Sequence, residues 1–254
     1  MTAPKAALVT GSAQRIGRTI ALDLAARGFR VGLHCNKSTD AAEALKVDIE
    51  AAGGTACVLP ADLADEAATN ALVAQTTEAL NAPLTLLINN ASTFDHDTVE
   101  TATRESWDWH MEANLRAPFV LSQKMAAALP GDQDGLIVNM IDQRVWKLTP
   151  AFMTYTLSKS GLWTLTQTMA QALAPRIRVN AIGPGPTLRN PRQSEEHFAK
   201  QMEGVPLKRG AALDEITDAI GFMLSARSMT GQMIALDGGQ HLGWETPDVV
   251  GVVE

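Results

Sequence analysis

Cysteine, tyrosine and long apolar runs are scarce in this sequence. Its 254 residues include two cysteines, Cys35 and Cys57, and a single tyrosine. Two cysteines in apolar, strand-like segments are typical of buried free thiols in a reducing compartment and argue against a disulfide framework. No apolar run approaches the ~18 residues that span a bilayer, and the first twelve residues, MTAPKAALVTGS, lack the pattern of a signal peptide. We therefore expect a soluble, cytoplasmic protein with no membrane partner.

Positively charged residues are also fewer than negatively charged ones. The chain has 21 lysines and arginines against 28 acidic residues, a net charge of -7, and its pI is about 5.3. An acidic surface repels phosphate backbones, so no nucleic-acid partner is expected, and an anionic cofactor would have to be held by local positive groups. The histidines show no ligand-like spacing with one another, so no metal site is expected; they are His34, His96, His110, His197 and His241.

Apolar strand-like runs alternate with helical patterns along the chain, without a repeat or a linker. Strands are predicted at 6–10, 30–34, 56–59, 84–89, 135–140, 178–182 and 233–236. Helices are predicted at 14–27, 40–52, 66–80, 104–129, 152–173, 194–203 and 213–226, with Pro118 disturbing the longest. This alternation predicts one α/β domain over residues 1–254, with a doubly wound parallel sheet and helices on both faces. Ligands bind such sheets beyond the carboxyl ends of the strands.

The loop after the first strand has the sequence TGSAQRIG at residues 10–17. Gly11 and Gly17 allow a phosphate to approach the backbone closely, and the following helix N-terminus offers free N–H groups and a favourable dipole. The spacing departs from the Gly-x-Gly-x-x-Gly pattern. Taken alone, the loop therefore fits an ordinary turn as well as a phosphate site.

The end of the second strand bears on the choice of dinucleotide. An NAD site usually has a carboxylate there, whereas this chain has HCNKS at residues 34–38 and no carboxylate before Asp40. A carboxylate would repel the 2′-phosphate of NADP, while Lys37, an amide and a hydroxyl can bind it. These residues favour NADPH. The alternative is that Lys37 is only a solvated loop charge.

Two further loops carry polar residues at strand ends. Asp62 and Leu63 follow the third strand, and NNAS at residues 89–92 follows the fourth. Such residues can line a cofactor trough or merely cap the next element. After the sixth strand, GPGPT at residues 183–187 forms either a rigid cover for a nicotinamide or a plain surface turn.

Tyr155 and Lys159 are four residues apart in a predicted helix and therefore share one helix face. A tyrosine hydroxyl has a pKa near ~10, which is high for acid–base work at neutral pH. A neighbouring ammonium favours the phenolate and lowers that pKa. The pair also arises by chance in helices, but Tyr155 is the one tyrosine of the chain.

Together and in this order, these motifs resemble the short-chain dehydrogenase/reductase family, and the resemblance spans nearly the whole chain. It implies a Rossmann fold of about seven strands, hydride transfer at a nicotinamide and, usually, a homotetramer. Tyr155 would be the acid, Lys159 would bind the nicotinamide ribose and tune Tyr155, and Asn114 would hold a water in a proton relay. The expected NADPH-binding residues are Gly11, Arg15, Ile16, Gly17, His34, Asn36, Lys37, Ser38, Asp62, Leu63, Asn90, Ala91, Ser92, Tyr155, Lys159, Pro184 and Gly185.

Two departures from the family resemble its pteridine reductase branch. Asp142 stands where a serine usually lies, thirteen residues before the tyrosine, and Arg15 stands where most members have glycine. The branch implies a dihydrobiopterin, dihydromonapterin or dihydrofolate substrate. Phe94 would stack on the pterin, Ser92 and Arg15 would contact its polar groups or the cofactor phosphates, and Asp142 would protonate a ring nitrogen together with Tyr155. The alternatives are a carboxylate at Asp142 satisfied by backbone N–H groups and a core role for Phe94.

Three functions therefore stay open. The first is an NADPH-dependent pterin reductase. The second is a carbonyl reductase of the same family, acting on 3-oxoacyl thioesters or small ketones. The third is a non-catalytic NADP(H)-sensing protein, against which the presence of Tyr155, Lys159 and Asn114 argues, because a sensor does not need a proton relay.

Overall fold

A single parallel sheet of seven strands forms the centre of the computed structural model, which describes residues 4–190, 193–246 and 250. The strand order is β3-β2-β1-β4-β5-β6-β7. The strands are β1 (Ala6–Val9), β2 (Arg30–Cys35), β3 (Thr55–Pro60), β4 (Leu84–Asn89), β5 (Gly135–Met140), β6 (Ile177–Pro184) and β7 (Met233–Leu236). The helices are α1 (Arg15–Ala26), α2 (Thr39–Ala51), α3 (Glu66–Leu80), α4 (Arg104–Met111), α5 (Ala117–Ala128), α6 (Met153–Leu173), α7 (Glu195–Glu203) and α8 (Leu213–Ser225).

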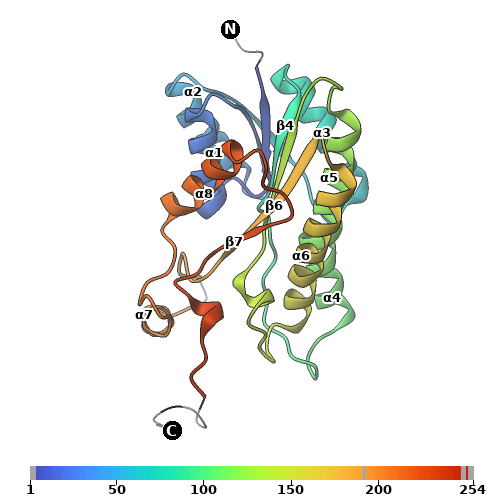
Figure 1. Cartoon of the computed structure of the whole chain (residues 1–254). Coiled ribbons are helices and arrows are strands. Elements are labelled where there is room, and N and C mark those ends of the chain that lie inside the picture. The colour runs from blue at the N-terminus through green and yellow to red at the C-terminus, as the bar shows by residue number, and fades with distance from the viewer. Residues whose placement is uncertain (1–3, 191–192, 247–249, 251–254) are drawn as a thin grey trace.

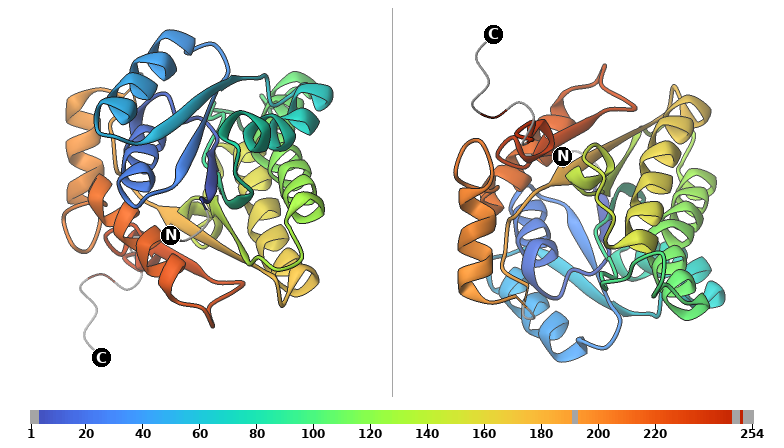
Figure 2. Two further views of the ribbon diagram at one scale, coloured as in Figure 1. Left: turned by 90° about the horizontal axis from the view of Figure 1, so that it is seen from above. Right: turned by 90° about the horizontal axis from the view of Figure 1, so that it is seen from below.

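Helices cover both faces of the sheet, as Figures 1 and 2 show. Successive side chains of β1 divide between two cores: Ala6 and Leu8 pack with α3, α5 and α6, whereas Ala7 and Val9 pack with α1, α2 and α8. This alternation explains why the strands are apolar throughout, since each side chain meets a helix layer. The carboxyl ends of the strands all lie at the end of the sheet near α7 (Figure 1).

The predicted α/β architecture is confirmed. The bounds of α3, β4, β5 and β7 are those expected from the sequence, and the ends of the other elements differ by at most two residues, apart from the longest helix. Two short 3-10 turns, at Gln143–Val145 and Gln240–Leu242, were not predicted, because three residues carry no periodic signal.

The long helical stretch predicted over 104–129 is present, and the irregularity expected at Pro118 lies just before that residue. A π-helical segment, Glu112–Arg116, separates α4 from α5, and Pro118 lies in the first turn of α5. Proline has no N–H to donate to the carbonyl of Asn114 four residues earlier, and its ring crowds that carbonyl. The irregularity therefore lies in the turn before Pro118, while the proline itself occupies a position where its missing N–H costs little.

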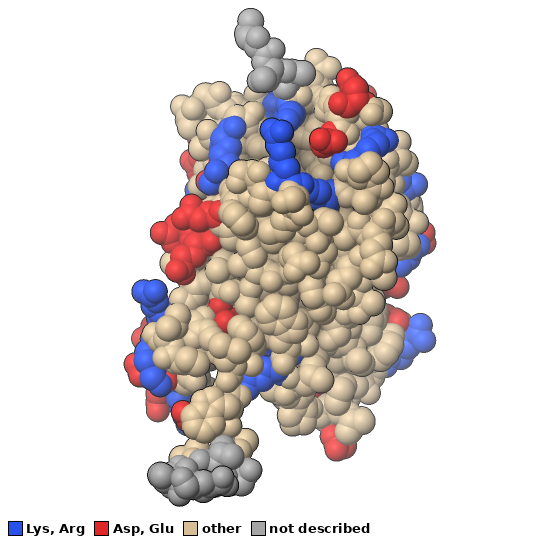
Figure 3. All heavy atoms as spheres, viewed as in Figure 1, with Lys and Arg blue, Asp and Glu red and all other residues tan. Residues whose placement is uncertain are grey.

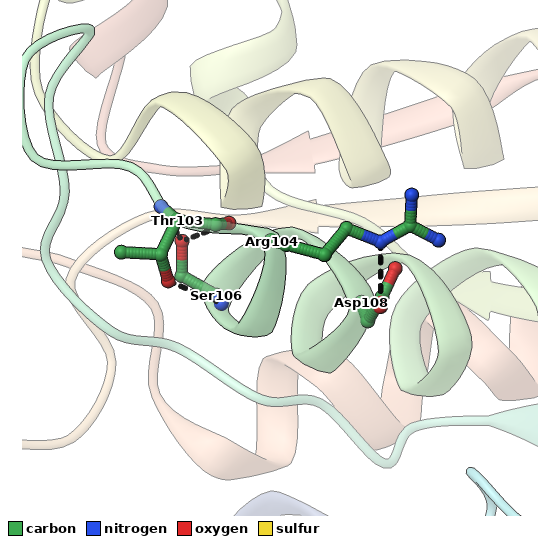
Figure 4. Close-up of polar contacts among 4 residues, drawn as sticks. All are labelled: Thr103, Arg104, Ser106 and Asp108. Atoms are coloured by element: carbon green, nitrogen blue, oxygen red, sulfur yellow. Dashed lines mark hydrogen bonds and ion pairs between the residues drawn. The ribbon is translucent and has the colours of Figure 1, made fainter.

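The N-terminus of α4 is fixed by its own side chains (Figure 4). The Thr103 hydroxyl accepts the Ser106 N–H at 3.1 Å, and the Ser106 hydroxyl accepts the Thr103 N–H at 3.0 Å. This reciprocal cap satisfies two N–H groups that a helix start leaves unpaired. Arg104 and Asp108 add an ion pair one turn apart, at 2.7 Å. α4 thus begins at a defined residue, which sets the position of the side chains it carries toward the site.

The described residues contain neither a membrane-spanning helix nor a cluster of metal-ligating side chains. Across 4–190, 193–246 and 250, no helix is both long and apolar enough to cross a membrane. The same stretch of chain contains no group of three or more His, Cys, Asp or Glu side chains able to hold a metal ion. Cys35 and Cys57 are both free thiols.

Candidate active site

A cleft of about 450 Å³ lies at the carboxyl ends of the first strands. It is bordered by the loop between β1 and α1 and by the segments that follow β2, β3 and β4. It gathers most residues predicted to bind the cofactor: Gly11, Arg15, Ile16, Gly17, His34, Asn36, Ser38, Asp62, Leu63, Asn90, Ala91 and Ser92. Positions up to 81 residues apart in sequence are thus brought together by the parallel topology.

Close backbone packing explains the two glycines of the first loop. Gly11 has a φ of +62°, and a Cβ on Gly17 would lie 2.2 Å from the Gly11 carbonyl oxygen. The Thr10 hydroxyl accepts the N–H groups of Asn90 and Ala91, both at 2.9 Å, which ties this loop to the end of β4. The first turn of α1 contains no acidic residue and has no side-chain cap. Its N–H groups and dipole therefore suit an anionic ligand.

His34 lines the cleft, but both of its ring nitrogens have partners within the protein. Its Nδ1 accepts the Gly11 N–H at 3.0 Å, and its Nε2 lies 3.1 Å from the carbonyl oxygen of Ala61. Nε2 therefore carries the proton. Burial lowers the pKa of His34, which favours the neutral ring. The imidazole thus supports the glycine loop, a contribution that its place near the end of a strand did not reveal.

Lys37 is exposed and is not among the residues that line the cleft, although its neighbours Asn36 and Ser38 are. Its role at the 2′-phosphate remains a prediction. We expect Lys37→Glu to weaken NADPH binding about tenfold or more, and NADH binding far less, because an attraction to the phosphate becomes a repulsion. Titration of nicotinamide fluorescence measures both affinities, with Lys46→Glu on α2 as the matched charge reversal. Equal effects on the two cofactors would place Lys37 away from the phosphate.

A second cavity of about 570 Å³ adjoins the first and contains the predicted catalytic side chains. The two share Arg15, Ile16, Asn90 and Ser92. The predicted residues that line the second cavity and not the first are Phe94, Asp142, Tyr155, Lys159, Pro184 and Gly185. A dinucleotide lying in the first cleft would therefore direct its far end toward Tyr155.

Tyr155 and Asp142 form the central contact of this cavity. The Tyr155 hydroxyl donates to Oδ2 of Asp142 at 2.9 Å. Oδ1 of Asp142 accepts the Arg144 N–H at 2.8 Å. One carboxylate oxygen therefore accepts a backbone N–H group, as the purely structural interpretation of Asp142 predicts. The other oxygen accepts from the hydroxyl of Tyr155, the single tyrosine of the chain.

The pKa values of this pair are shifted upward. Burial raises the pKa of Asp142, although hydrogen bonding and the nearby positive charges of Arg144 and Lys159 oppose the shift. Burial, together with the negative charge of Asp142, raises the pKa of Tyr155 well above its ordinary value. Burial and the carboxylate outweigh the charge of Arg144 and the hydrogen bond with Ser92, both of which lower the tyrosine pKa. A lowering of that pKa by Lys159 remains a prediction.

Lys159 lies one helical turn from Tyr155 and is fully buried. Its ammonium donates to the Met140 carbonyl oxygen at 2.8 Å. Burial lowers the pKa of Lys159 to about 8, against the opposing charge of Asp142. The side chain therefore gives up its proton more readily than an exposed lysine, which suits a group close to a proton-transfer site.

Asn114 lies in the π-helical segment, and its side chain is occupied by protein partners. Its Oδ1 accepts the Thr93 N–H at 2.8 Å, while Nδ2 donates to the Thr93 carbonyl at 3.0 Å and to the Ser158 hydroxyl at 3.1 Å. The amide therefore links the loop after β4 to α6. The role predicted for Asn114 in a proton relay remains a prediction, and its side chain serves this link.

The backbone conformation at Arg15 explains why most family members have a glycine at this position. Its φ is +55°, in the left-handed region that glycine enters without strain. The guanidinium donates to the carbonyl oxygens of Leu188 and Arg189, both at 3.0 Å. Arg15 thus links the first loop to the segment after β6, and it lines both cavities.

Phe94 is partly exposed at the cavity wall, which argues against the alternative that it is a core residue. Its ring stacks on Phe152 with a centroid separation of 4.6 Å and an interplanar angle of 5°. It also meets Tyr155 edge-on, again at 4.6 Å. An aromatic ring held on two sides forms a firm platform for a flat heteroaromatic substrate.

A buried polar network behind Tyr155 was missed by sequence reasoning. Nε2 of His110 accepts the Asp95 N–H at 3.0 Å, so Nδ1 carries the proton and lies 2.9 Å from the Ser106 carbonyl oxygen. The Thr154 hydroxyl hydrogen-bonds to Asp97. The network joins α4, the loop that carries Phe94 and the first turn of α6. No spacing pattern could have revealed it, because its members come from three separate segments.

The short chain dehydrogenase family model matches residues 5–199, so this chain belongs to that family. A 3-oxoacyl-[acyl-carrier-protein] reductase, FabG, of Staphylococcus epidermidis is 30% identical, over 94% of this chain and 99% of the relative. The crystal structure of FolM alternative dihydrofolate reductase 1 from Brucella suis, in complex with NADP, matches with a TM-score of 0.94 and 52% identity, over 98% of this chain and 99% of that one. A short chain dehydrogenase from Burkholderia cenocepacia, also with NADP, matches with a TM-score of 0.86 and 33% identity, over 93% and 97%.

Proposed function

We propose that the protein is an NADPH-dependent reductase of pterins of the dihydrobiopterin, dihydromonapterin or dihydrofolate type. The observation that carries the proposal is the 2.9 Å contact between the Tyr155 hydroxyl and Asp142, beside the Phe94 platform in one cavity. The 52% identity to a protein called an alternative dihydrofolate reductase supports the same class of substrate.

The cleft beside α1 fits the proposed cofactor. The helix N-terminus faces the cleft without an acidic residue in its first turn, and Asn36 and Ser38 offer uncharged hydrogen-bonding groups after β2. The similar structures from Brucella and Burkholderia are both NADP complexes. When bound, NADPH supplies the hydride. The residues of the second cavity then have to position the acceptor and supply the proton.

Pterin reduction adds a hydride to the carbon of a C=N bond and a proton to the nitrogen. The raised pKa of Asp142 keeps its carboxyl protonated at a higher pH than an exposed aspartate, which suits a proton donor. The Tyr155 hydroxyl can pass a proton through its hydrogen bond to Asp142. Lys159, with a pKa lowered to about 8, lies close enough to stabilise the charge left behind.

The first test is NADPH oxidation at saturating substrate. We expect turnover with dihydrobiopterin, dihydromonapterin or dihydrofolate at a typical enzyme rate of about 1–10³ s⁻¹, and little with simple ketones. Absorbance at the nicotinamide band measures it, and product chromatography confirms the reduced pterin. Activity on ketones with none on any pterin would refute the proposal while leaving the family unchanged.

A carbonyl reductase is the second candidate, favoured by the 30% identity to a 3-oxoacyl-[acyl-carrier-protein] reductase. Tyr155 and Lys159 would serve that reaction equally well, since a ketone needs one proton on oxygen. Asp142 argues against it, because most members of the family have a serine at this position, and a hydroxyl suits a carbonyl oxygen. A non-catalytic NADP(H) sensor would have no need for the Tyr155–Asp142 pair.

Assembly and location belong to the same proposal: a single domain over 1–254, forming a homotetramer in the cytoplasm. Trp107 and Trp109 on α4 are 43% and 47% exposed, and the edge strand β7 is partly exposed along its length. The face in Figure 3 has a broad area without charged side chains at its centre. Such surfaces favour contacts between subunits. The free thiols of Cys35 and Cys57 favour a reducing compartment.

A further inference from the structure

A third cavity, of about 490 Å³, opens beside the active-site cavity. We call it the outer pocket. Phe94, Asn190, Gln193 and Gln201 line both cavities, so the two are neighbours across this shared wall. The rest of the outer pocket is formed by His96, Arg144, Phe152 and His197. A substrate ring stacked on Phe94 would therefore carry any long substituent into the outer pocket.

The charge of the outer pocket is opposite to that of the whole chain. The net charge of the protein is -7, yet none of the described residues that line this pocket is an aspartate or a glutamate. Arg144 supplies a positive charge, and the rings of His96 and His197 add N–H groups that can donate to an anion. This selection of side chains favours an anionic ligand.

Arg144 has donor capacity to spare. One terminal nitrogen donates to the Thr149 hydroxyl at 2.6 Å, while Nε is buried and has no hydrogen-bond partner among the described residues. A buried N–H without a partner is costly unless a ligand or water satisfies it. The guanidinium lies 4.9 Å from the centre of the Phe152 ring, a contact that holds it at the pocket wall.

Phe94 and Phe152 form another part of the wall, next to the Arg144 guanidinium. The two phenylalanine rings are stacked, and the His96 ring lies nearly perpendicular to Phe152, with 5.0 Å between the ring centroids. The backbone of Phe152 has a φ of +60°, and its N–H donates to the Asp97 carbonyl at 2.7 Å. The pocket therefore offers a flat apolar surface close to a cation, which suits an aromatic ring that bears a carboxylate.

Building on the proposed pterin reductase function, we propose that the outer pocket binds an aromatic, carboxylate-bearing substituent of the substrate and that Arg144 determines this specificity. A pterin with a benzoyl-glutamate substituent, as in dihydrofolate, has this chemistry. A pterin with a short hydroxylated side chain, as in dihydrobiopterin, would leave the pocket empty. Arg144 also influences Asp142 through its charge, so its specificity role has to be measured as a ratio between substrates.

The test compares kcat/KM for dihydrofolate with kcat/KM for dihydrobiopterin. We expect Arg144→Gln to lower this ratio about ten- to hundredfold, the range for losing one charge-assisted hydrogen bond. Any effect that acts through Asp142 applies to both substrates and cancels. Lys147→Gln removes a charge from the same loop outside the pocket, and it should change the ratio less than about twofold. Turnover of both pterins with an unchanged ratio in Arg144→Gln would overturn the inference and leave the proposed function intact.

A second measurement does not depend on pterin turnover. Saturation-transfer NMR on the NADP-loaded wild-type protein should detect binding of p-aminobenzoyl-glutamate, weakened at high salt. The same signal should be reduced in Arg144→Gln and retained in Lys147→Gln. Absence of binding to the wild type would overturn the inference even if every pterin is reduced. If Arg144→Gln does not fold, as judged by circular dichroism, Arg144→Lys and the salt dependence of the wild-type ratio take its place, and a salt-independent ratio counts against the proposal.

Discussion

Replacing Tyr155 with phenylalanine is expected to lower kcat for pterin reduction about 10²–10⁴-fold, the usual contribution of a positioned acid. The change removes only the hydroxyl, which donates to Asp142 at 2.9 Å. The ring and its edge-on contact with Phe94 stay. Steady-state NADPH oxidation measures the loss, and it should appear in kcat rather than in the affinity for NADPH.

The control for this substitution is cofactor binding, followed by nicotinamide fluorescence, together with thermal unfolding. Both should stay close to the wild type, since burying one hydroxyl fewer seldom costs more than about 1–2 kcal/mol. A loss of less than about threefold in kcat would mean that Asp142 donates the proton by itself. In that case Tyr155 would be a support for the carboxyl group and not a donor.

Replacing Asp142 with asparagine should produce the second large effect, a loss of about 10²-fold or more in kcat on pterins. The pKa of Asp142 is raised, chiefly by burial, so the carboxyl is protonated below that pKa and loses its proton as the pH rises through it. A reaction that uses the protonated acid must therefore slow with rising pH. The pH profile of kcat should show this decline in the wild type and lose it in Asp142→Asn.

Asp142→Ser separates the two candidate reactions. Serine is the residue usual at this position in the family, and a hydroxyl suits a carbonyl oxygen. We expect the variant to gain activity on ketones while losing activity on pterins, measured with the same substrate panel as the wild type. If neither activity changes, Asp142 serves only to accept the Arg144 N–H and the Tyr155 hydroxyl.

Strands and helices could be predicted from the sequence because their hydrophobic patterns lie within single segments of the chain. The apolar runs that became β4 and β5 are bounded by polar loops, and the bounds of both strands were expected correctly. The position of Asp142 relative to Tyr155 was also informative, since a parallel topology places the end of β5 beside the start of α6. The family resemblance indicated which roles Asp142 and Tyr155 would have.

What the sequence could not provide depends on contacts between distant segments. The outer pocket combines the loops after β4, β5 and β6 with α7, and no pattern in any one segment indicates it. The direction of the Tyr155 pKa shift required knowledge of burial, because burial is its largest cause and the charges of Asp142 and Arg144 act in opposite directions. The hydrogen bonds of His34 likewise depend on β1 and β3 lying beside β2.

The geometry of the site depends on the number of residues in the π-helical segment Glu112–Arg116. A π turn holds more residues than an α turn, so deleting one residue between 112 and 116 would allow α4 and α5 to fuse into a regular helix. Each residue of an α-helix turns the chain by about 100°, and α4 would rotate by that amount relative to α5. His110 would leave the polar network behind Tyr155, and Asn114 would leave Thr93. A deletion that surface loops absorb without effect would here dismantle two supports of the active site at once.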